Sequence, residues 1–350
     1  MSACCAAILT FVVVSWLLSS CLCEKGIVVS FIFQSPAGCP GELARESPVS
    51  EVVTSPSVIS CSALCASSPD CQAITFDPDS RTCQLFPQSE NCTGVKKAEE
   101  MMNYFVKEPQ CQNGGTLQGR RCECPPGYIG QTCELGPMRD CFDYKMNGWL
   151  QSSGVHVIRP TDSVSFPVFC IAEGHVVFLR RLNNRVNFTR PWRDYRDGFG
   201  DISGSHWLGL EKMHILTSQD RVYQLRVQIA LTNGTNIYTF YNNFTVRDGS
   251  QFYQFDFTVN AMANDCLSDL RRISFSTYDS DNDGDSSVNC ASRHSGGWWF
   301  RGNTCSTCNP TGQLLQPANG LRTGVDSEVF WIKDLGDVVP FRIRFSLANM

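Results

Sequence analysis

The sequence lacks the motifs by which most hydrolases and nucleotide-binding enzymes can be recognised. Its five histidines do not form a His-Glu-x-x-His pair, and neither a Gly-x-Ser-x-Gly turn nor a phosphate-binding loop is present. Basic residues are also scarce, with 29 Lys and Arg against 34 Asp and Glu and a net charge of −5. This balance argues against nucleic acid or an anionic membrane as the main partner. We therefore expect a binding protein and not an enzyme.

The N-terminal residues 1–23 lack any charged side chain. Ala6–Leu18 is an apolar run with the length of a signal-peptide core, and small residues follow it, so we predict a secretory signal peptide that is cut after Cys23. The alternative is an uncleaved membrane anchor, because apolar residues return at Ile27–Phe33. The run falls short of the roughly 20 apolar residues that span a bilayer. The expected location is secreted and extracellular, with a membrane partner only if the anchor is kept.

Cysteine, in contrast, is abundant. Four of the 20 cysteines lie in residues 1–23, which leaves an even set of 16 in the mature chain. An even, high count behind a signal peptide indicates an oxidising compartment and disulfide-stapled modules. Four Asn-x-Thr sequons fit a glycosylated extracellular surface, namely those at Asn91, Asn187, Asn233 and Asn243.

The first module spans 39–110, after a short N-terminal segment, 24–38. A helical run over Val58–Ala66 places Cys61 and Cys65 on one face, and short β-type runs follow. The pattern resembles the PAN/apple module, a small α+β fold that usually binds proteins or carbohydrate. The alternative is a spacer stapled by disulfides for want of a large core. The resemblance implies the pairs Cys61–Cys83 and Cys65–Cys71, which leaves Cys39–Cys92.

The second module, 111–134, is short. Its ending, Cys-x-Cys-x2-Gly-Tyr-x-Gly-x2-Cys from Cys122 to Cys133, resembles that of EGF-like domains, which are small β folds. Four cysteines occur where that family has six, and Leu117 stands in the place of the third. The resemblance implies Cys111–Cys122 and Cys124–Cys133. We interpret the module as a rigid connector without a binding site.

The third module, 135–350, carries a series of phrases that resemble fibrinogen C-terminal-like domains. They include Asp140-Cys141, Tyr195–Gly200 and Ser205–Leu210, and they continue to the C-terminus. An α+β fold is expected, with antiparallel strands over Arg221–Leu231, Ile237–Tyr241, Gln251–Val259 and Phe341–Ser346. The resemblance implies the disulfides Cys141–Cys170 and Cys290–Cys305, and parity leaves Cys266–Cys308.

Within this module, four aspartates alternate from Asp279 to Asp285 in a loop that ends at Cys290. Alternating carboxylates put hard oxygens on one side of a loop, as Ca²⁺ requires. An EF-hand is excluded, because Cys290 stands where the bidentate glutamate is needed. The fibrinogen resemblance implies Ca²⁺ as cofactor, held by the side chains of Asp281 and Asp283 and by the main-chain carbonyls of Asp285 and Ser287. The alternative is a solvated acidic turn without metal.

At the position of the family's ligand pocket, this chain departs from the family pattern. Relatives that bind acetylated sugars carry a histidine after the cysteine that matches Cys305, together with nearby tyrosines. This chain has Ser306 there, and no tyrosine between Cys290 and Met350. We expect a ligand other than the usual acetamido sugar. The candidate ligand-binding residues are His294, Phe300, Ser306 and Trp331.

The function that follows is calcium-dependent recognition of surface glycans or glycoproteins, similar to the fibrinogen-related lectins of innate immunity. The alternative is an adhesion or signalling ligand of the extracellular matrix, similar to tenascins and angiopoietins, whose partner is a cell-surface receptor protein. Neither a coiled-coil heptad run nor a collagen repeat is present. The usual means of multimerisation in defence lectins is therefore missing.

Overall fold

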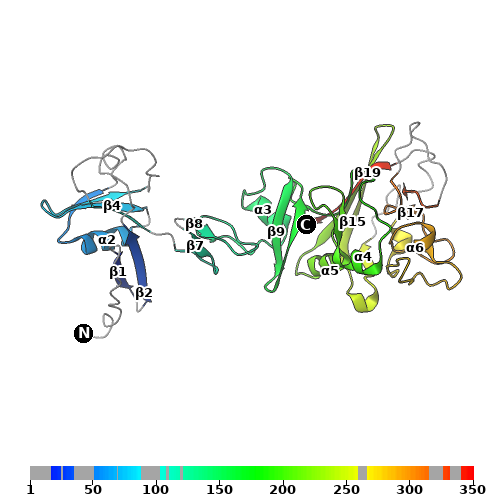
Figure 1. The fold of residues 1–350 in the computed structure, drawn as a ribbon, viewed down its shortest axis with the longest axis horizontal. Coiled ribbons are helices and arrows are strands. Elements are labelled where there is room, and N and C mark those ends of the chain that lie inside the picture. The colour runs from blue at the N-terminus through cyan, green and yellow to red at the C-terminus, as the bar shows by residue number, and fades with distance from the viewer. Residues whose placement is uncertain are drawn as a thin grey trace. The chain divides into compact units, whose positions relative to one another are not determined.

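The computed structural model divides the chain into two compact units, shown as ribbons in Figure 1. The first comprises Met1–Gln112 and Thr116–Glu123, and the second comprises Asn113–Gly115 and Cys124–Met350. The boundary passes through the segment that we assigned to an EGF-like module. The structure describes residues 17–24, 27–34, 51–68, 70–87, 103–107, 110–118, 121–258, 266–314, 326–331 and 340–350.

The first unit is a helix packed on a small antiparallel sheet. Helix α2 (Val58–Ser67) begins after Ser57, whose hydroxyl accepts a hydrogen bond from the Ser60 N–H. Cys61 and Cys65 are fully buried on its inner face and form disulfides with Cys83 and Cys71. The sheet order is β1-β2-β6-β4-β5-β3, with bounds β1 Leu17–Glu24, β2 Ile27–Gln34, β3 Glu51–Thr54, β4 Ala73–Asp77, β5 Thr82–Phe86 and β6 Asn103–Lys107.

Strand β1 coincides with the end of the predicted signal peptide. It pairs antiparallel with β2, from Leu17 opposite Gln34 to Glu24 opposite Ile27, because both segments are apolar and only two residues separate them. Cleavage after Cys23 would remove all of β1 except Glu24 and would leave β2 as the edge strand. In the described part of the chain, the helices are too short or too polar to cross a membrane.

The second predicted module contains a two-stranded hairpin, β7 (Thr116–Gln118) and β8 (Arg121–Glu123). Leu117, which replaces a cysteine of the EGF pattern, lies opposite Cys122 in this hairpin. The disulfide Cys111–Cys122 belongs to the first unit and Cys124–Cys133 to the second. The assignment as an EGF-like domain remains a prediction.

The second unit is built on a nine-stranded sheet. Its main path is β12-β13-β11-β19-β14-β15-β16, and β10 pairs with both β11 and β9. Strand β14 alternates strictly between buried and half-buried residues, as the sequence predicted for a strand with one face in the core. The bounds are β9 Gly154–Thr161, β10 Val164–Cys170, β11 Val176–Arg181, β12 Phe199–Gly200, β13 His206–Trp207, β14 Tyr223–Leu231, β15 Asn236–Val246, β16 Phe255–Thr258 and β19 Pro340–Asn349.

The last strand, β19, lies in the middle of this sheet, between β11 and β14. The sequence predicted that it completes the sheet. The predicted strand over 251–259 is shorter in the structure, because Gly249–Gln251 forms a 3₁₀ turn, η1, before β16 begins. Three short helices belong to this unit, α3 Cys141–Met146, α4 Trp192–Asp197 and α5 Leu210–Thr217, and α5 packs against β15.

Between β16 and β19, the described residues form a lobe with little regular structure. It contains η2 (Ser268–Leu270), α6 (Cys290–Arg293) and a small sheet of β17 (Cys308–Asn309) and β18 (Phe330–Trp331). The disulfides Cys266–Cys308 and Cys290–Cys305 cross it, and Cys141–Cys170 joins α3 to β10. Seven of the eight predicted cysteine pairs are thus bonded in the structure, and Cys39–Cys92 lies outside the described residues.

A buried acidic residue links the start of the second unit to the sheet. Asp140 is 1% exposed and caps α3 by accepting two backbone N–H bonds. Its other oxygen accepts from the Tyr223 hydroxyl (2.8 Å) and pairs with Arg221 (2.9 Å). Since Tyr223 begins β14, this carboxylate fixes α3 against the sheet.

We predict that Asp140→Asn destabilises the second unit by about 1–3 kcal/mol, because Arg221 and the Tyr223 hydroxyl lose a charged buried acceptor, while Arg221 keeps its ion pair with Asp143. The unfolding midpoint in urea measures the change. The control is Asp162→Asn at an exposed position. Equal midpoints for the two variants would contradict the role given to Asp140.

Candidate functional site

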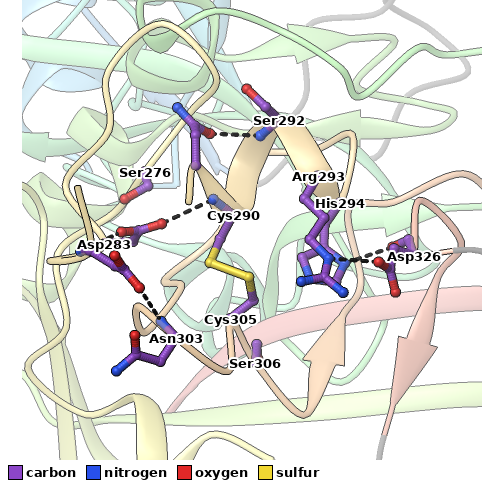
Figure 2. The surroundings of a disulfide bond; sticks show 12 residues. Ser276, Asp283, Cys290, Ser292, Arg293, His294, Asn303, Cys305, Ser306 and Asp326 are labelled. Carbon is purple, nitrogen blue, oxygen red and sulfur yellow. Dashed lines mark hydrogen bonds and ion pairs between the residues drawn. A yellow bond between two sulfur atoms is a disulfide. The ribbon is translucent and has the colours of Figure 1, made fainter. Parts of the chain in front are cut away.

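The acidic loop that follows Tyr278 is shaped by hydrogen bonds to its own aspartates. Asp279 accepts from the Trp192 N–H (2.8 Å) and the Thr277 hydroxyl (2.7 Å), so it fixes the loop to the start of α4. Asp283 is 7% exposed and accepts from the N–H groups of Asp285 (2.9 Å) and Cys290 (3.0 Å). Figure 2 shows the second of these bonds. Asp279 and Asp283 therefore have structural roles in the loop.

A second segment packs against this loop and was not foreseen as part of the site. The Gly302 N–H donates to the Asp283 carbonyl (2.8 Å), and the Asn303 N–H donates to the Asp285 carboxylate (3.1 Å). The Cys290–Cys305 disulfide joins the two segments (Figure 2). The predicted disulfide was the sequence feature from which this contact could have been found.

The carboxylate of Asp281 differs from its neighbours. Its side chain is exposed and accepts one long bond, from the Asp283 N–H at 3.3 Å. Partial desolvation, together with the carboxylates of Asp283 and Asp285, raises the pKa of Asp281. In the described part of the chain, none of these three aspartates has a basic partner. The loop therefore concentrates negative charge beside solvent without a protein cation.

The donor set fits a hard cation that keeps part of its water shell. Asp281 and Asp283 supply carboxylate oxygens, and calcium accepts carbonyl and water oxygens as well. The Asp285 side chain is engaged by the Ser287 N–H and hydroxyl, and these bonds lower its pKa, so its carbonyl is the better donor. Within the described ranges, no three His, Cys, Asp or Glu side chains converge as metal ligands. Any site here is thus one of two carboxylates with carbonyls and water.

The predicted ligand-binding residues are placed at different depths. His294 is 5% exposed and Phe300 is fully buried, and their rings stack at 5.4 Å. His294 Nδ1 lies 2.6 Å from the Asp326 carbonyl, and burial lowers its pKa, so the ring is neutral at physiological pH. Ser306 is half-buried beside Cys305 (Figure 2). For Trp331, the structure describes only the backbone, in β18.

The structure therefore brings His294 and Phe300 together, but in the interior of the lobe. Beside them, Arg293 forms an ion pair with Asp326 (2.6 Å), so the helix α6 is tied to the chain before β18. Sequence reasoning did not identify this pair, because 33 residues separate its members. Of the four candidates, Ser306 is the one whose side chain is described and partly open to solvent.

Comparisons with known proteins identify the family. The model of the C-terminal globular domain of fibrinogen beta and gamma chains matches residues 137–346, and the PAN domain model matches residues 39–111. The chain therefore belongs to the fibrinogen C-terminal domain family, and it carries a PAN domain ahead of that domain. The predicted α+β fold and both of these modules are confirmed. No catalytic family is indicated.

Two curated relatives illustrate the extent of the similarity. Fibrinogen C domain-containing protein 1 of Xenopus tropicalis is 40% identical over 191 residues, which are 51% of this chain and 40% of the relative. Human fibroleukin is 32% identical over 231 residues, which are 62% of this chain and 51% of the relative. The chain thus spans about half or less of the length of these relatives.

Solved structures agree on the fold of the C-terminal part. The fibrinogen-like globe domain of human ANGPTL2 is 29% identical with a TM-score of 0.55, and the match covers 61% of this chain and 99% of that one. A lamprey fibrin D-dimer in complex with the peptide Gly-His-Arg-Pro-amide is 27% identical with a TM-score of 0.54, covering 61% and 74%.

Gly302 tests whether its segment supports the acidic loop. A Cβ atom there would lie 2.6 Å from the Asp285 Cβ and 3.1 Å from the Asp283 carbonyl oxygen. We predict that Gly302→Ala destabilises the second unit by about 1–3 kcal/mol, because the loop must shift. Gly154→Ala is the matched control, since its Cβ would meet nothing closer than 3.9 Å. A thermal midpoint for Gly302→Ala as high as that of the control would refute the packing.

Proposed function

We propose that this protein is secreted and that its fibrinogen-like domain recognises surface glycans or glycoproteins through a face stabilised by Ca²⁺ on the acidic loop, in the manner of innate-defence lectins. The observation that carries the proposal is the loop itself. A single loop, anchored by the Cys290–Cys305 disulfide, carries Asp281 and Asp283 without a basic partner, and a divalent cation would offset the repulsion between them. Calcium binding is also common in fibrinogen C-terminal domains.

Calcium would act here as a structural ion. Asp281 and Asp283 would hold it, with the carbonyls of Asp285 and Ser287, and it would supply positive charge that lets the carboxylates stay ionised at close range. Asp283 also accepts from the Cys290 N–H, so ordering this carboxylate orders the start of α6. The ligand face that we propose, formed by α6 and Ser306, would then depend on the metal even though the ligand does not touch the metal.

A protein ligand is the second candidate, and one observation favours it. The lamprey fibrin structure that shares this fold is a complex with a peptide, Gly-His-Arg-Pro-amide. Together with the replacement of the family histidine by Ser306, this supports the alternative of an extracellular matrix adhesion or signalling ligand that binds a receptor protein. The PAN domain would add a second contact in either case, and two linked weak sites gain avidity on one surface.

A glycan array probed with the mature protein, with calcium and with chelator, distinguishes the two candidates. Hits that the chelator abolishes support the lectin. An array without hits, together with saturable binding to cells whose surface glycans were removed enzymatically, supports the receptor ligand. Hits that are equal with and without calcium would contradict the proposed dependence on metal.

The acetyl pocket gives a separate prediction. We predict that free N-acetylglucosamine at millimolar concentration does not elute the protein from its target surface, because Ser306 is too short to replace the histidine of sugar-binding relatives. Loss of two polar contacts at about 1.4 kcal/mol each weakens binding about a hundredfold. Efficient elution by N-acetylglucosamine, measured against glucose as control, would show that other residues rebuild the pocket.

The raised pKa of Asp281 predicts that wild type and Asp281→Asn exchange their order of stability when metal is added. A folded-state pKa above the unfolded value means that the carboxylate supports folding at low pH and that this support is lost as pH rises through the folded pKa. In chelator at neutral pH, Asp281→Asn should therefore melt above the wild type, and the difference should vanish below about pH 3.9.

Saturating calcium should invert this order. Wild-type protein at about 100 times the dissociation constant gains about 2.7 kcal/mol, and Asp281→Asn, with a weaker ligand, gains less. Thermal scans of both proteins in calcium and in chelator make the comparison, and Asp220→Asn at an exposed position outside the loop serves as control. An equal calcium shift in wild type and Asp281→Asn would rule out this residue as a ligand.

A further inference from the structure

A second feature of the C-terminal lobe is a cavity of about 270 Å³ away from the acidic loop. It is lined by Arg181 at the end of β11, by residues of the 184–189 turn, by Ser295, and by 311–314. Arg181 is the one charged residue of this lining. The cavity therefore has a basic group and no acidic group in its described wall.

Arg181 is held firmly in the wall. Its side chain is 2% exposed, and its Nη1 donates to the carbonyls of Pro310 (3.0 Å) and Gly312 (2.7 Å). Its guanidinium lies over the Phe188 ring, 4.0 Å from the ring centroid. These contacts fix the plane of the guanidinium, and they are all with neutral groups.

The charge of Arg181 is uncompensated in the described part of the chain, where no carboxylate forms an ion pair with it. Burial lowers its pKa to about 10, which still leaves the side chain protonated at physiological pH. Buried charges in proteins are normally paired, because removal from water is costly. The arrangement thus leaves a place for an anion.

The hydrogen bonds of Arg181 also leave one edge of the guanidinium unused. Both bonds leave from Nη1, while Nε is buried without an acceptor. Among the described residues, none accepts from Nη2 either. The Nε and Nη2 hydrogens point the same way and form the fork that receives the two oxygens of a carboxylate.

We propose that this cavity binds a small carboxylate, whose two oxygens accept from Nε and Nη2 of Arg181. A guanidinium fork matches both carboxylate and phosphate geometry, and the planar carboxylate is the smaller of the two groups. The side-chain amides of Asn184 and Gln313 are exposed at the lining and can donate further bonds to the bound group. This site does not depend on the acidic loop or on calcium.

Acetate and acetamide form a matched pair of probes, because they share a shape and differ in charge. The full mature chain carries Asn187→Gln, because Asn187 is a predicted glycosylation site and lies in the cavity lining. It is titrated with ¹³C-labelled acetate and followed by NMR, after its other N-glycans are trimmed to a single sugar so that no acidic sugar of its own competes. We expect saturable binding of acetate and none of acetamide. Non-saturable acetate binding, or acetamide bound as tightly as acetate, would overturn the proposal.

Two neighbouring arginines provide the variant and its control. Arg181→Lys keeps the charge but loses the fork, and we expect acetate affinity to fall at least tenfold, or about 1.4 kcal/mol. Arg180→Lys alters the adjacent residue, which lies over Phe169 and outside the cavity lining, and should leave affinity unchanged. Should Arg181→Lys fail to fold, Asn184→Asp places a competing carboxylate at the exposed rim and must also weaken acetate. If Arg181→Lys, or Asn184→Asp in its place, folds and binds acetate as tightly as the wild type, the site is refuted.

Discussion

The C-terminal lobe depends on the connection between Asp283 and the Cys290–Cys305 disulfide. The buried Asp283 carboxylate accepts a hydrogen bond from the Cys290 N–H, and the Asp283 main-chain carbonyl accepts one from the Gly302 N–H. The Cys290–Cys305 disulfide then closes a ring between the acidic loop and the segment that contains Gly302. This connection holds the acidic loop, helix α6 and the segment before Ser306 together. Because the ring is covalent on one side and hydrogen-bonded on the other, the charge state of the loop can influence helix α6 and the segment before Ser306.

The modular order and most of the covalent frame could be predicted from the sequence. Cysteine spacing, in combination with the family resemblance, is enough to define pairs such as Cys61–Cys83, because a helix places cysteines four apart on one face. Strict alternation predicted β14 and β19. The order of strands could not be predicted in this way, since the position of β19 between β11 and β14 is set by contacts between distant segments.

The sequence identified the residues of the candidate site, but it did not predict how deeply their side chains are buried. The family resemblance placed His294 and Phe300 at the ligand pocket, yet the two rings stack on each other inside the lobe. Burial depends on what the surrounding chain covers, and a local pattern carries little information about that. The unpaired charge of Arg181 was hidden for the same reason: the sequence shows an arginine, and only packing shows that its neighbours are neutral carbonyls and a ring.

We propose that Asp281 and Asp283 hold a calcium ion, and isothermal titration of the chelator-treated mature protein with Ca²⁺ is the decisive experiment. We expect one saturable ion per chain in the wild type and strongly weakened binding in Asp281→Ala, with Asp220→Ala as control. Wild-type protein that binds no calcium, or an Asp281→Ala variant that binds it as tightly as the wild type, would show that these aspartates do not form a calcium site.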